Sequence, residues 1–215
     1  MKARPAAKQI HPRAAAGRRD GIGINIIPVN NGNNGKGNNG IEPPKTLREG
    51  KSKDKILRII PLGGLEEVGR NMTVLEYGKD IIIIDMGLQF PEEDMHGIDY
   101  IIPNSRYLRD KTDNIRGVIV THGHLDHIGA IPHHVRVLGN PPIYTGAMTK
   151  AIILKRQEEF KDGPRLRIHS VNEDDYLQLG IFEIEFFHVC HIIPDSLGFA
   201  IHTPVGTIID RKSVV

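Results

Sequence analysis

Short runs of apolar residues, separated by turn-forming residues, make up most of the chain from Lys55 onward. Runs of this kind, rich in Val, Ile and Phe with Gly, Pro, Asn or Asp between them, are typical of β-strands. In Ile181–Phe187 apolar and acidic side chains alternate, as expected of a strand with one face in water. The predicted strands are Ile56–Ile60, Met72–Tyr77, Ile81–Ile84, Val118–Val120, Ile143–Thr145, Leu166–His169, Ile181–Phe187, Leu197–His202 and Thr207–Ile209.

Two other segments repeat apolar residues every three or four positions, which predicts helices. The first begins near His127 and ends at Gly139, and the second covers Met148–Phe160. Pro132 lies in the first turn or so of the former, where a missing N–H group is tolerated. Early strands in hairpin order, followed by strands with helices between them, favour a layered α/β sandwich over a doubly wound sheet.

The first 54 residues lack both patterns and are predicted to form a disordered arm. Their Asn- and Gly-rich tract, residues 30–40, offers almost no side chain for a core, so nothing offsets the entropy of ordering it. The arm holds 11 Lys and Arg residues against 4 Asp and Glu residues. Two interpretations stay open: the arm contacts a nucleic-acid backbone, or it is a solubilising tail.

The composition narrows the class of protein further. With 215 residues, 39% of them hydrophobic, the chain can form a packed core. The single cysteine, Cys190, excludes an internal disulfide framework, and no apolar signal segment is recognised near the N-terminus. We therefore expect a cytoplasmic protein. No apolar run approaches the roughly 18 residues of a spanning helix, so no membrane association is expected.

Candidate metal ligands are most concentrated in Thr121–His127, where three imidazoles and one carboxylate follow an apolar run. Imidazole nitrogen and carboxylate oxygen are the ligands that zinc-like cations prefer. His122 and His124 stand two residues apart, so in an extended segment they point to the same side and can share one cation. Asp126 and His127 follow as the chain turns into a helix and can serve a second cation, about 3.5–4 Å away as in two-metal hydrolases.

The first cation needs a third ligand from elsewhere, and His191 is the best candidate because it follows a predicted strand. His188 competes with it from the opposite face, and Cys190 is an alternative soft ligand, although such a cysteine is more often a small buried hydrophobe. Asp126 could instead cap the following helix. Asp85 could either orient a ligand imidazole or be a structural strand-end residue. The remaining histidines are taken as non-ligands: His96, His133, His134, His169 and His202.

Around these residues the sequence resembles a known family. The segment Thr121–Pro132 (THGHLDHIGAIP) resembles motif two of the metallo-β-lactamase superfamily, and Asp85 resembles its motif-one Asp. His191, within His-Ile-Ile-Pro-Asp-Ser, resembles motif three. Further segments are similar to the N-terminal part of ribonuclease J, and the similarity runs from about Leu57 to Ile209; these segments are residues 61–71, 85–91, 97–103 and 185–187.

This resemblance implies an αββα sandwich and two divalent metal ions of the Zn²⁺ type. It assigns His122, His124 and His191 to one ion and Asp126 and His127 to the other, with Asp126 also serving in catalysis. It implies hydrolysis of RNA phosphodiesters, by 5′-to-3′ exonuclease and endonuclease activities, in RNA processing and decay. It further implies RNA as the partner and a homo-oligomer in the intact relatives.

The last predicted strand leads away from the family pattern. In the family it continues into a Thr-Gly-Asp stretch whose Asp bridges the two metals, whereas here it continues into Asp210-Arg211, and Asp210 stands too early for that role. Ile192 replaces a usual Ser, and Asn104 replaces an expected Asp. The second metal site is therefore expected to be incomplete.

The expected organisation is a basic arm over residues 1–54 and a metallo-β-lactamase-like domain over residues 55–215 that is truncated before the β-CASP domain. We expect weak or no nuclease activity from this chain. Two other functions stay open. A small-molecule hydrolase of the same superfamily, such as a lactonase or thioesterase, would be found by an ester or lactone substrate screen. A non-catalytic module would bind RNA or a partner in a salt-sensitive way and take up at most one metal.

Overall fold

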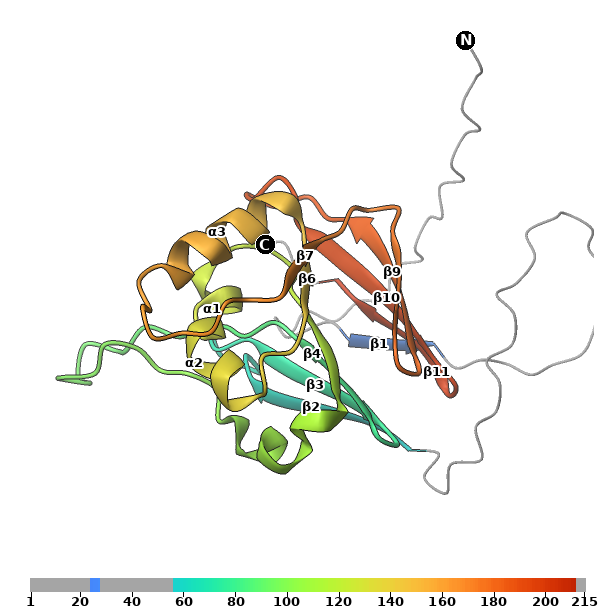
Figure 1. Ribbon diagram of the computed structural model, residues 1–215, viewed down its shortest axis with the longest axis horizontal. Helices are drawn as coiled ribbons and strands as arrows, with labels where there is room; N and C mark the ends of the chain where they lie inside the picture. Colours follow the sequence, from blue (N-terminus) through green and yellow to red (C-terminus); the bar gives the residue numbers. More distant parts are fainter. Residues whose placement is uncertain (1–23, 28–55, 212–215) are drawn as a thin grey trace, which may run out of the picture.

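The computed structural model describes residues 56–211 and the backbone of residues 24–27, and it consists of two β-sheets packed face to face with helices on one side (Figure 1). The central sheet contains, in spatial order, β2 (Leu57–Gly63), β3 (Met72–Tyr77), β4 (Asp80–Ile84), β5 (Ile115–Ile119), β6 (Ile143–Thr145) and β7 (Ile168–Ser170). The outer sheet contains, in spatial order, β1 (Ile24–Ile27), β11 (Gly206–Asp210), β10 (Leu197–Thr203), β9 (Phe182–His188) and β8 (Tyr176–Leu179). The helices are α1 (Leu125–Ile128), α2 (Ile131–Val137), α3 (Ala147–Gln157) and the 3₁₀ helix η1 (Ser105–Asn114).

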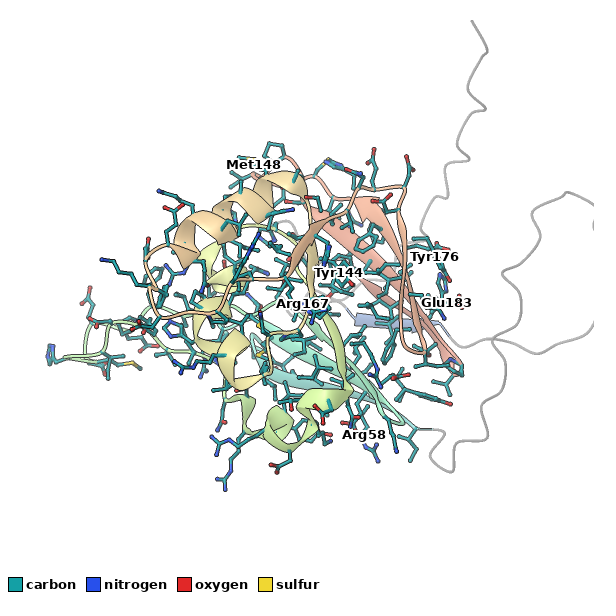
Figure 2. All side chains as sticks on the ribbon, viewed as in Figure 1. Arg58, Tyr144, Met148, Arg167, Tyr176 and Glu183 are labelled. Atoms are coloured by element: carbon teal, nitrogen blue, oxygen red, sulfur yellow. The ribbon has the colours of Figure 1, made fainter. Side chains whose placement is uncertain are left out.

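The central sheet is buried on both faces, which explains why its strands are almost uniformly apolar. Successive residues of β4 point to opposite faces, so Ile81 and Ile83 pack against the helices while Ile82 and Ile84 pack against the outer sheet. The second of these two cores contains the aromatic pair Phe186 and Phe199. The layers are therefore helices, central sheet and outer sheet, and Figure 2 shows side chains filling both interlayer spaces. This arrangement confirms the expected layered α/β sandwich.

The strand directions bring several chain segments to one edge of the molecule. The strands β2, β3 and β4 form antiparallel hairpins, but β4, β5, β6 and β7 are parallel. Because β4 and β5 are parallel neighbours, the residues that follow them emerge side by side, and Asp85 N–H donates to Ile119 O at 2.9 Å. The outer sheet is antiparallel, and the segment between β9 and β10 reaches the same edge, where Leu197 N–H donates to Thr121 O at 2.9 Å.

All nine predicted strands are present, with ends that differ by a few residues. The helix predicted from His127 to Gly139 is wrong as a single element, because the chain forms α1 and α2 with Gly129 and Ala130 between them. Pro132 lies at the start of α2, where its missing N–H group costs no helical hydrogen bond. The sequence analysis missed β1, β8 and η1. The strand β8 is short and lies at a sheet edge, and η1 has a single buried residue, Leu108.

Within the predicted arm, strand β1 pairs antiparallel with β11. The remainder of residues 1–54 lies outside the described residues, as do residues 212–215, so the predicted domain organisation stays a prediction. In the part of the chain that the structure describes, every helix is too short or too polar to cross a membrane.

Candidate metal centre

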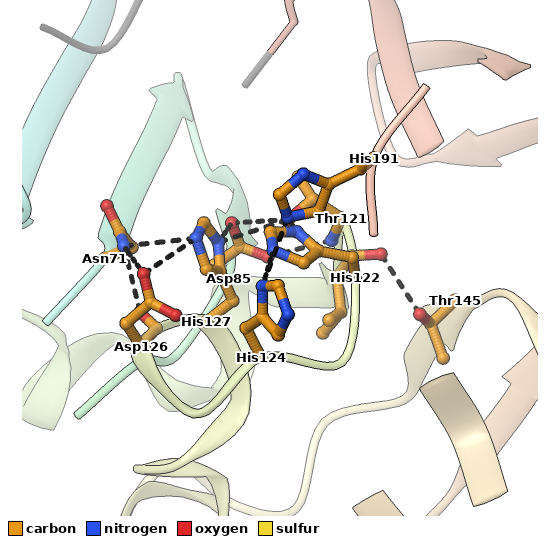
Figure 3. A network of polar contacts seen from close by, with 10 residues as sticks. Asn71, Asp85, Thr121, His122, His124, Asp126, His127, Thr145 and His191 are labelled. Carbon is orange, nitrogen blue, oxygen red and sulfur yellow. Dashed lines mark hydrogen bonds and ion pairs between the residues drawn. The ribbon is translucent and has the colours of Figure 1, made fainter. Parts of the chain in front are cut away.

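The predicted ligands come together at the edge where β4, β5 and β9 end (Figure 3). His122 and His124 lie in the turn that connects β5 to α1, and His191 lies in the loop between β9 and β10. The Nε2 atom of His122 is 3.0 Å from Nδ1 of His124, and Nε2 of His191 is 3.1 Å from the same atom. One nitrogen from each ring lies within 4.8 Å of the other two, so the predicted triad is assembled.

The three rings face one common point from three directions. Each pair of rings among His122, His124 and His191 is nearly perpendicular, with interplanar angles of 80–85° and centroid separations of 4.4–4.9 Å. Two nitrogen ligands of a tetrahedral Zn²⁺ ion stand about 3.3 Å apart, because Zn–N bonds are about 2.0–2.1 Å long. The two nitrogen separations from His124, 3.0 and 3.1 Å, are within a few tenths of an ångström of that value. The donor set and its spacing therefore fit a divalent cation.

The electrostatics of the site keep the rings of His122 and His191 neutral, as metal ligands must be. Burial and the neighbouring His127 lower the pKa of His122 to about 3. Burial and the adjacent His124 also lower the pKa of His191. At neutral pH these two rings are therefore uncharged, and each has one nitrogen lone pair for a metal ion.

Asp85 is a completely buried carboxylate that orients part of this site. It accepts hydrogen bonds from the backbone N–H of Thr121 at 2.8 Å and from the Thr121 hydroxyl at 3.0 Å. Its Oδ2 atom lies 2.8 Å from Nδ1 of His127, which places the His127 proton on Nδ1 and leaves the Nε2 lone pair available. The geometry thus supports the interpretation that Asp85 orients a ligand imidazole. The backbone of Asp85 is left-handed, with φ 59°.

Asp126 and His127 form the second predicted pair, beside the triad. The rings of His122 and His127 have centroids 4.1 Å apart, and Nε2 of His127 lies 3.2 Å from Oδ2 of Asp126. The alternative that Asp126 caps the following helix is wrong, because His124 occupies the N-cap position of α1. Burial alone would raise the pKa of Asp126, but the neighbouring His127 outweighs it and the pKa is lowered. Asp126 is therefore a carboxylate at neutral pH.

Asn71 is a site residue that the sequence analysis missed. Its amide nitrogen lies 3.0 Å from Asp126 O, 3.2 Å from Asp126 Oδ2 and 3.3 Å from His127 Nε2, so it donates toward both members of the pair. Nearby, Gly87 has no room for a side chain, since a Cβ there would lie 1.5 Å from Asp126 O. The signal that could have found Asn71 was its position at the end of the segment of residues 61–71 that resembles ribonuclease J.

Several competing candidates do not reach this site. His188 is exposed, and its Nε2 atom lies 3.2 Å from Pro194 O. Cys190 is exposed and does not belong to the triad, so it is neither the buried hydrophobe nor the soft ligand considered above. Within residues 56–211, one set of three or more His, Cys, Asp or Glu side chains lies close enough together to hold a metal ion. This set consists of His122, His124 and His191.

Comparison with known proteins gives a family match over the part of the chain that holds the predicted ligands. The model of the family described as the metallo-beta-lactamase superfamily matches residues 65–201, a range that contains all five predicted ligands.

The curated relatives are named as ribonucleases. The chain is 40% identical over 158 residues to ribonuclease J of Synechocystis sp., a match that covers 73% of this chain and 25% of that protein. It is 38% identical over 159 residues to ribonuclease J 2 of Staphylococcus aureus, with 74% and 28% covered. It is 40% identical over 151 residues to ribonuclease J 1 of Streptococcus pyogenes serotype M3, with 70% and 27% covered. The chain thus spans about a quarter of the length of the curated relatives it matches.

Solved structures with low sequence identity share the fold. A protein of unknown function from Enterococcus faecalis V583 matches with a TM-score of 0.53 and 19% identity, over 70% of this chain and 43% of that one. A metallo-beta-lactamase with a HARLDQ motif from Cronobacter sakazakii matches with a TM-score of 0.50 and 15% identity, over 70% and 59%. These likenesses confirm the fold class expected from the resemblance.

Proposed function

This chain belongs to the metallo-beta-lactamase superfamily, and from that premise we propose that it is the metal-binding part of an RNA hydrolase of the ribonuclease J type. The observation that carries the proposal is the convergence of three imidazoles beside a carboxylate–imidazole pair. RNA is proposed as the substrate because the curated relatives over most of this chain are named ribonuclease J. The bond hydrolysed is the RNA phosphodiester, by 5′-to-3′ exonuclease and endonuclease action in cytoplasmic RNA processing.

The five predicted ligands divide into two sets. His122, His124 and His191 would hold one divalent cation, and Asp126 with His127 would hold a second. Zn²⁺ is the proposed ion for the first set because imidazole suits zinc and the spacing matches a tetrahedral site. When bound, such cations lower the pKa of a water molecule and stabilise negative charge on a phosphoryl group.

The surrounding residues prepare the pair for this chemistry. Asp85 holds a proton on Nδ1 of His127, so that Nε2, which lies beside Asn71 and Asp126, keeps its lone pair. Asn71 donates toward Asp126 and His127 and keeps their ligand atoms side by side. The Asp126 side chain is 37% exposed, so this end of the site is the one that meets a substrate from solvent. In the triad, His122 is buried, whereas His124 and His191 are half-buried.

The second cation is expected to bind weakly to this chain. In the described residues no further His, Cys, Asp or Glu joins Asp126 and His127 to make a third ligand. We therefore expect slow RNA hydrolysis that requires a millimolar excess of metal. A homo-oligomer remains part of the proposal for the intact relatives.

The test is a paired measurement of metal content and RNA hydrolysis on the purified 215-residue chain. Metal-free protein is titrated with Zn²⁺ or Mn²⁺ and then incubated with a 5′-monophosphorylated, 3′-labelled RNA. We expect one tightly bound ion and slow release of nucleotides in excess metal, both lost in His122→Ala. The matched control is His169→Ala, which changes an exposed histidine that stacks on Tyr144 at 5.3 Å, and it should behave as the parent.

Three results would contradict the proposal. Absence of a tightly bound ion would refute the metal site. Hydrolysis of a lactone, thioester or β-lactam in preference to RNA would favour a small-molecule hydrolase. Salt-sensitive RNA binding with bound metal but no hydrolysis would identify a non-catalytic module.

A further inference from the structure

Asp195 lies in the loop that carries His191, and its carboxylate contacts the start of α3. The loop covers residues 189–196 between β9 and β10, and Asp195 stands four residues after His191. Its Oδ2 atom accepts hydrogen bonds from the backbone N–H groups of Met148 at 2.7 Å and Thr149 at 3.1 Å. Its Oδ1 atom accepts from the Thr149 hydroxyl at 3.1 Å. Metal binding alone does not explain this part of the His-Ile-Ile-Pro-Asp-Ser motif.

These three contacts make Asp195 the capping group of α3. The first N–H groups of a helix have no partner within the helix and need an acceptor. The N-cap residue of α3 is Gly146, which has no side chain to supply one, and the first turn of α3 contains no acidic residue. A carboxylate from a segment 46 residues away takes that place, and its negative charge is favourable at a helix N-terminus.

The loop and the helix are in direct contact at this point. A Cβ atom at Gly146 would lie 2.2 Å from Asp195 Oδ2, so glycine is required for the carboxylate to approach. A Cβ at Gly123 would lie 2.7 Å from Cδ1 of Ile152 in α3 and 3.4 Å from Cδ1 of Ile193 in the loop. The loop, α3 and the turn with His122 and His124 therefore meet around Gly123. Met148 marks the start of α3 in Figure 2.

The other end of the loop is fixed by the backbone. Leu197 N–H donates to Thr121 O at 2.9 Å, and Val189 N–H donates to Ser196 O at 3.0 Å. The Ser196 hydroxyl donates to Ile193 O at 2.7 Å. These bonds close the loop and attach it to the end of β5, but they do not attach it to α3. Asp195 supplies that second attachment.

We propose that Asp195 is a positioning residue for His191: by capping α3 it fixes the loop so that the His191 imidazole lies against His124. This inference rests on the proposed metal site. Without the cap the loop keeps its attachment to β5 but gains freedom around His191. The triad then loses its preorganised third nitrogen, and the ion must order the loop as it binds. The expected result is a loss of affinity for Zn²⁺ of roughly 10- to 100-fold, as for other residues that orient metal ligands.

The experiment measures Zn²⁺ affinity of the triad by competition with a chromogenic chelator, for the full chain and four variants. In Asp195→Ala the dissociation constant should rise at least tenfold, and the visible spectrum of the Co²⁺ form should change shape. In Asp195→Asn it should stay within about threefold of the parent, because Asn is as good an N-cap as Asp. Thr149→Val removes one of the three donors and should give a smaller loss.

Ala151→Gly is the matched control for a general weakening of α3. Ala151 is an exposed residue inside α3, and glycine there costs about 1 kcal/mol of helix stability without touching the loop. This variant should melt at a lower temperature and still bind Zn²⁺ as the parent does. A weakened affinity equal to that of Asp195→Ala would show that helix stability, not loop position, sets the affinity, and would overturn the inference.

Hydrogen exchange of the metal-free proteins separates this inference from the proposed function. Amides of residues 189–196 should exchange faster in Asp195→Ala than in the parent or in Ala151→Gly. If the parent binds Zn²⁺ and Asp195→Ala binds it equally well, the inference is wrong and the metal site stands. If the parent binds no Zn²⁺, the proposed function fails, and unchanged exchange in the loop would then refute the positioning role by itself.

Discussion

The substitution Asp85→Asn tests how the site fixes the imidazole of His127. Asn keeps the size of the side chain and, like Asp, is among the non-glycine residues that best tolerate the left-handed backbone at this position, φ 59°. It replaces one carboxylate oxygen by an NH₂ group. The backbone N–H and hydroxyl of Thr121 can both donate to the remaining oxygen, so the NH₂ group faces Nδ1 of His127.

Two donors cannot share this hydrogen bond, and the imidazole is expected to change tautomer. His127 then accepts through Nδ1 and carries its proton on Nε2, the atom beside Oδ2 of Asp126. A protonated Nε2 cannot bind a cation, so the affinity for the second ion should fall about 10- to 100-fold. The lost charge-assisted hydrogen bond should also lower the free energy of unfolding by about 2 kcal/mol. The triad is untouched, and its Zn²⁺ affinity should change by less than about threefold.

The assay is ¹⁵N NMR of the histidine side chains in metal-free protein, combined with a titration of the second ion. In the parent the His127 resonances should report a proton on Nδ1, and in Asp85→Asn a proton on Nε2. A variant that keeps the Nδ1 proton and binds the second ion with unchanged affinity would refute the reasoning. A selective loss at the triad would also contradict it, because the Asp85 carboxylate acts on the ring of His127.

Three further changes have defined outcomes. Asn71→Ala removes the amide that lies 3.2 Å from Asp126 Oδ2, and isothermal titration should show the second ion about tenfold weaker with the triad unchanged. Gly87→Ala forces a Cβ to within 1.5 Å of Asp126 O and should lower the free energy of unfolding in urea by about 3 kcal/mol. The control Gly97→Ala has no atom within 4 Å and should lower it by about 1 kcal/mol, because of the positive φ at that position. Equal losses in the two variants would refute the steric argument. His134→Leu tests stability in acid. Burial lowers the pKa of His134 to about 4, so below pH 6.5 the unfolded chain takes up a proton that the folded chain does not. The free energy of unfolding therefore falls as the pH drops toward 4. The variant should reduce that fall by about 3 kcal/mol in denaturant melts at pH 7 and pH 4, and an unchanged fall would exclude His134 as the cause.

The strands could be predicted from the sequence because the order of apolar and polar residues in each strand follows which of its faces are buried. Ile81–Ile84 is apolar at every position since it lies between two cores, and Ile181–Phe187 alternates since the outer sheet has a wet face. The helix from His127 to Gly139 was mispredicted because its apolar period continues across the break. Periodicity records which face of a segment is buried. It does not record whether the backbone turns between two segments that bury the same face.

The candidate ligands could be found from the sequence because four of them lie within six residues. His191 required a further argument from its position after a strand, and the structure brings it to the triad while His188 remains exposed. Asn71 and Asp195 could not be found in this way, since each acts on residues about 50 positions away along the chain. Amides and carboxylates are common on every surface. Their role depends on which loops meet, and the fold decides that.

The central sheet is covered on both faces, and this has a consequence for the ion that binds at its edge. Strands that are packed on both faces cannot move to adapt to a bound ion. The turns that follow β4 and β5 therefore hold their ligands in fixed positions. An entering cation therefore has to accept the angles that it finds. Ions that bind four nitrogen or oxygen ligands fit such a site well. Ions that require six oxygen ligands in an octahedron bind it less tightly.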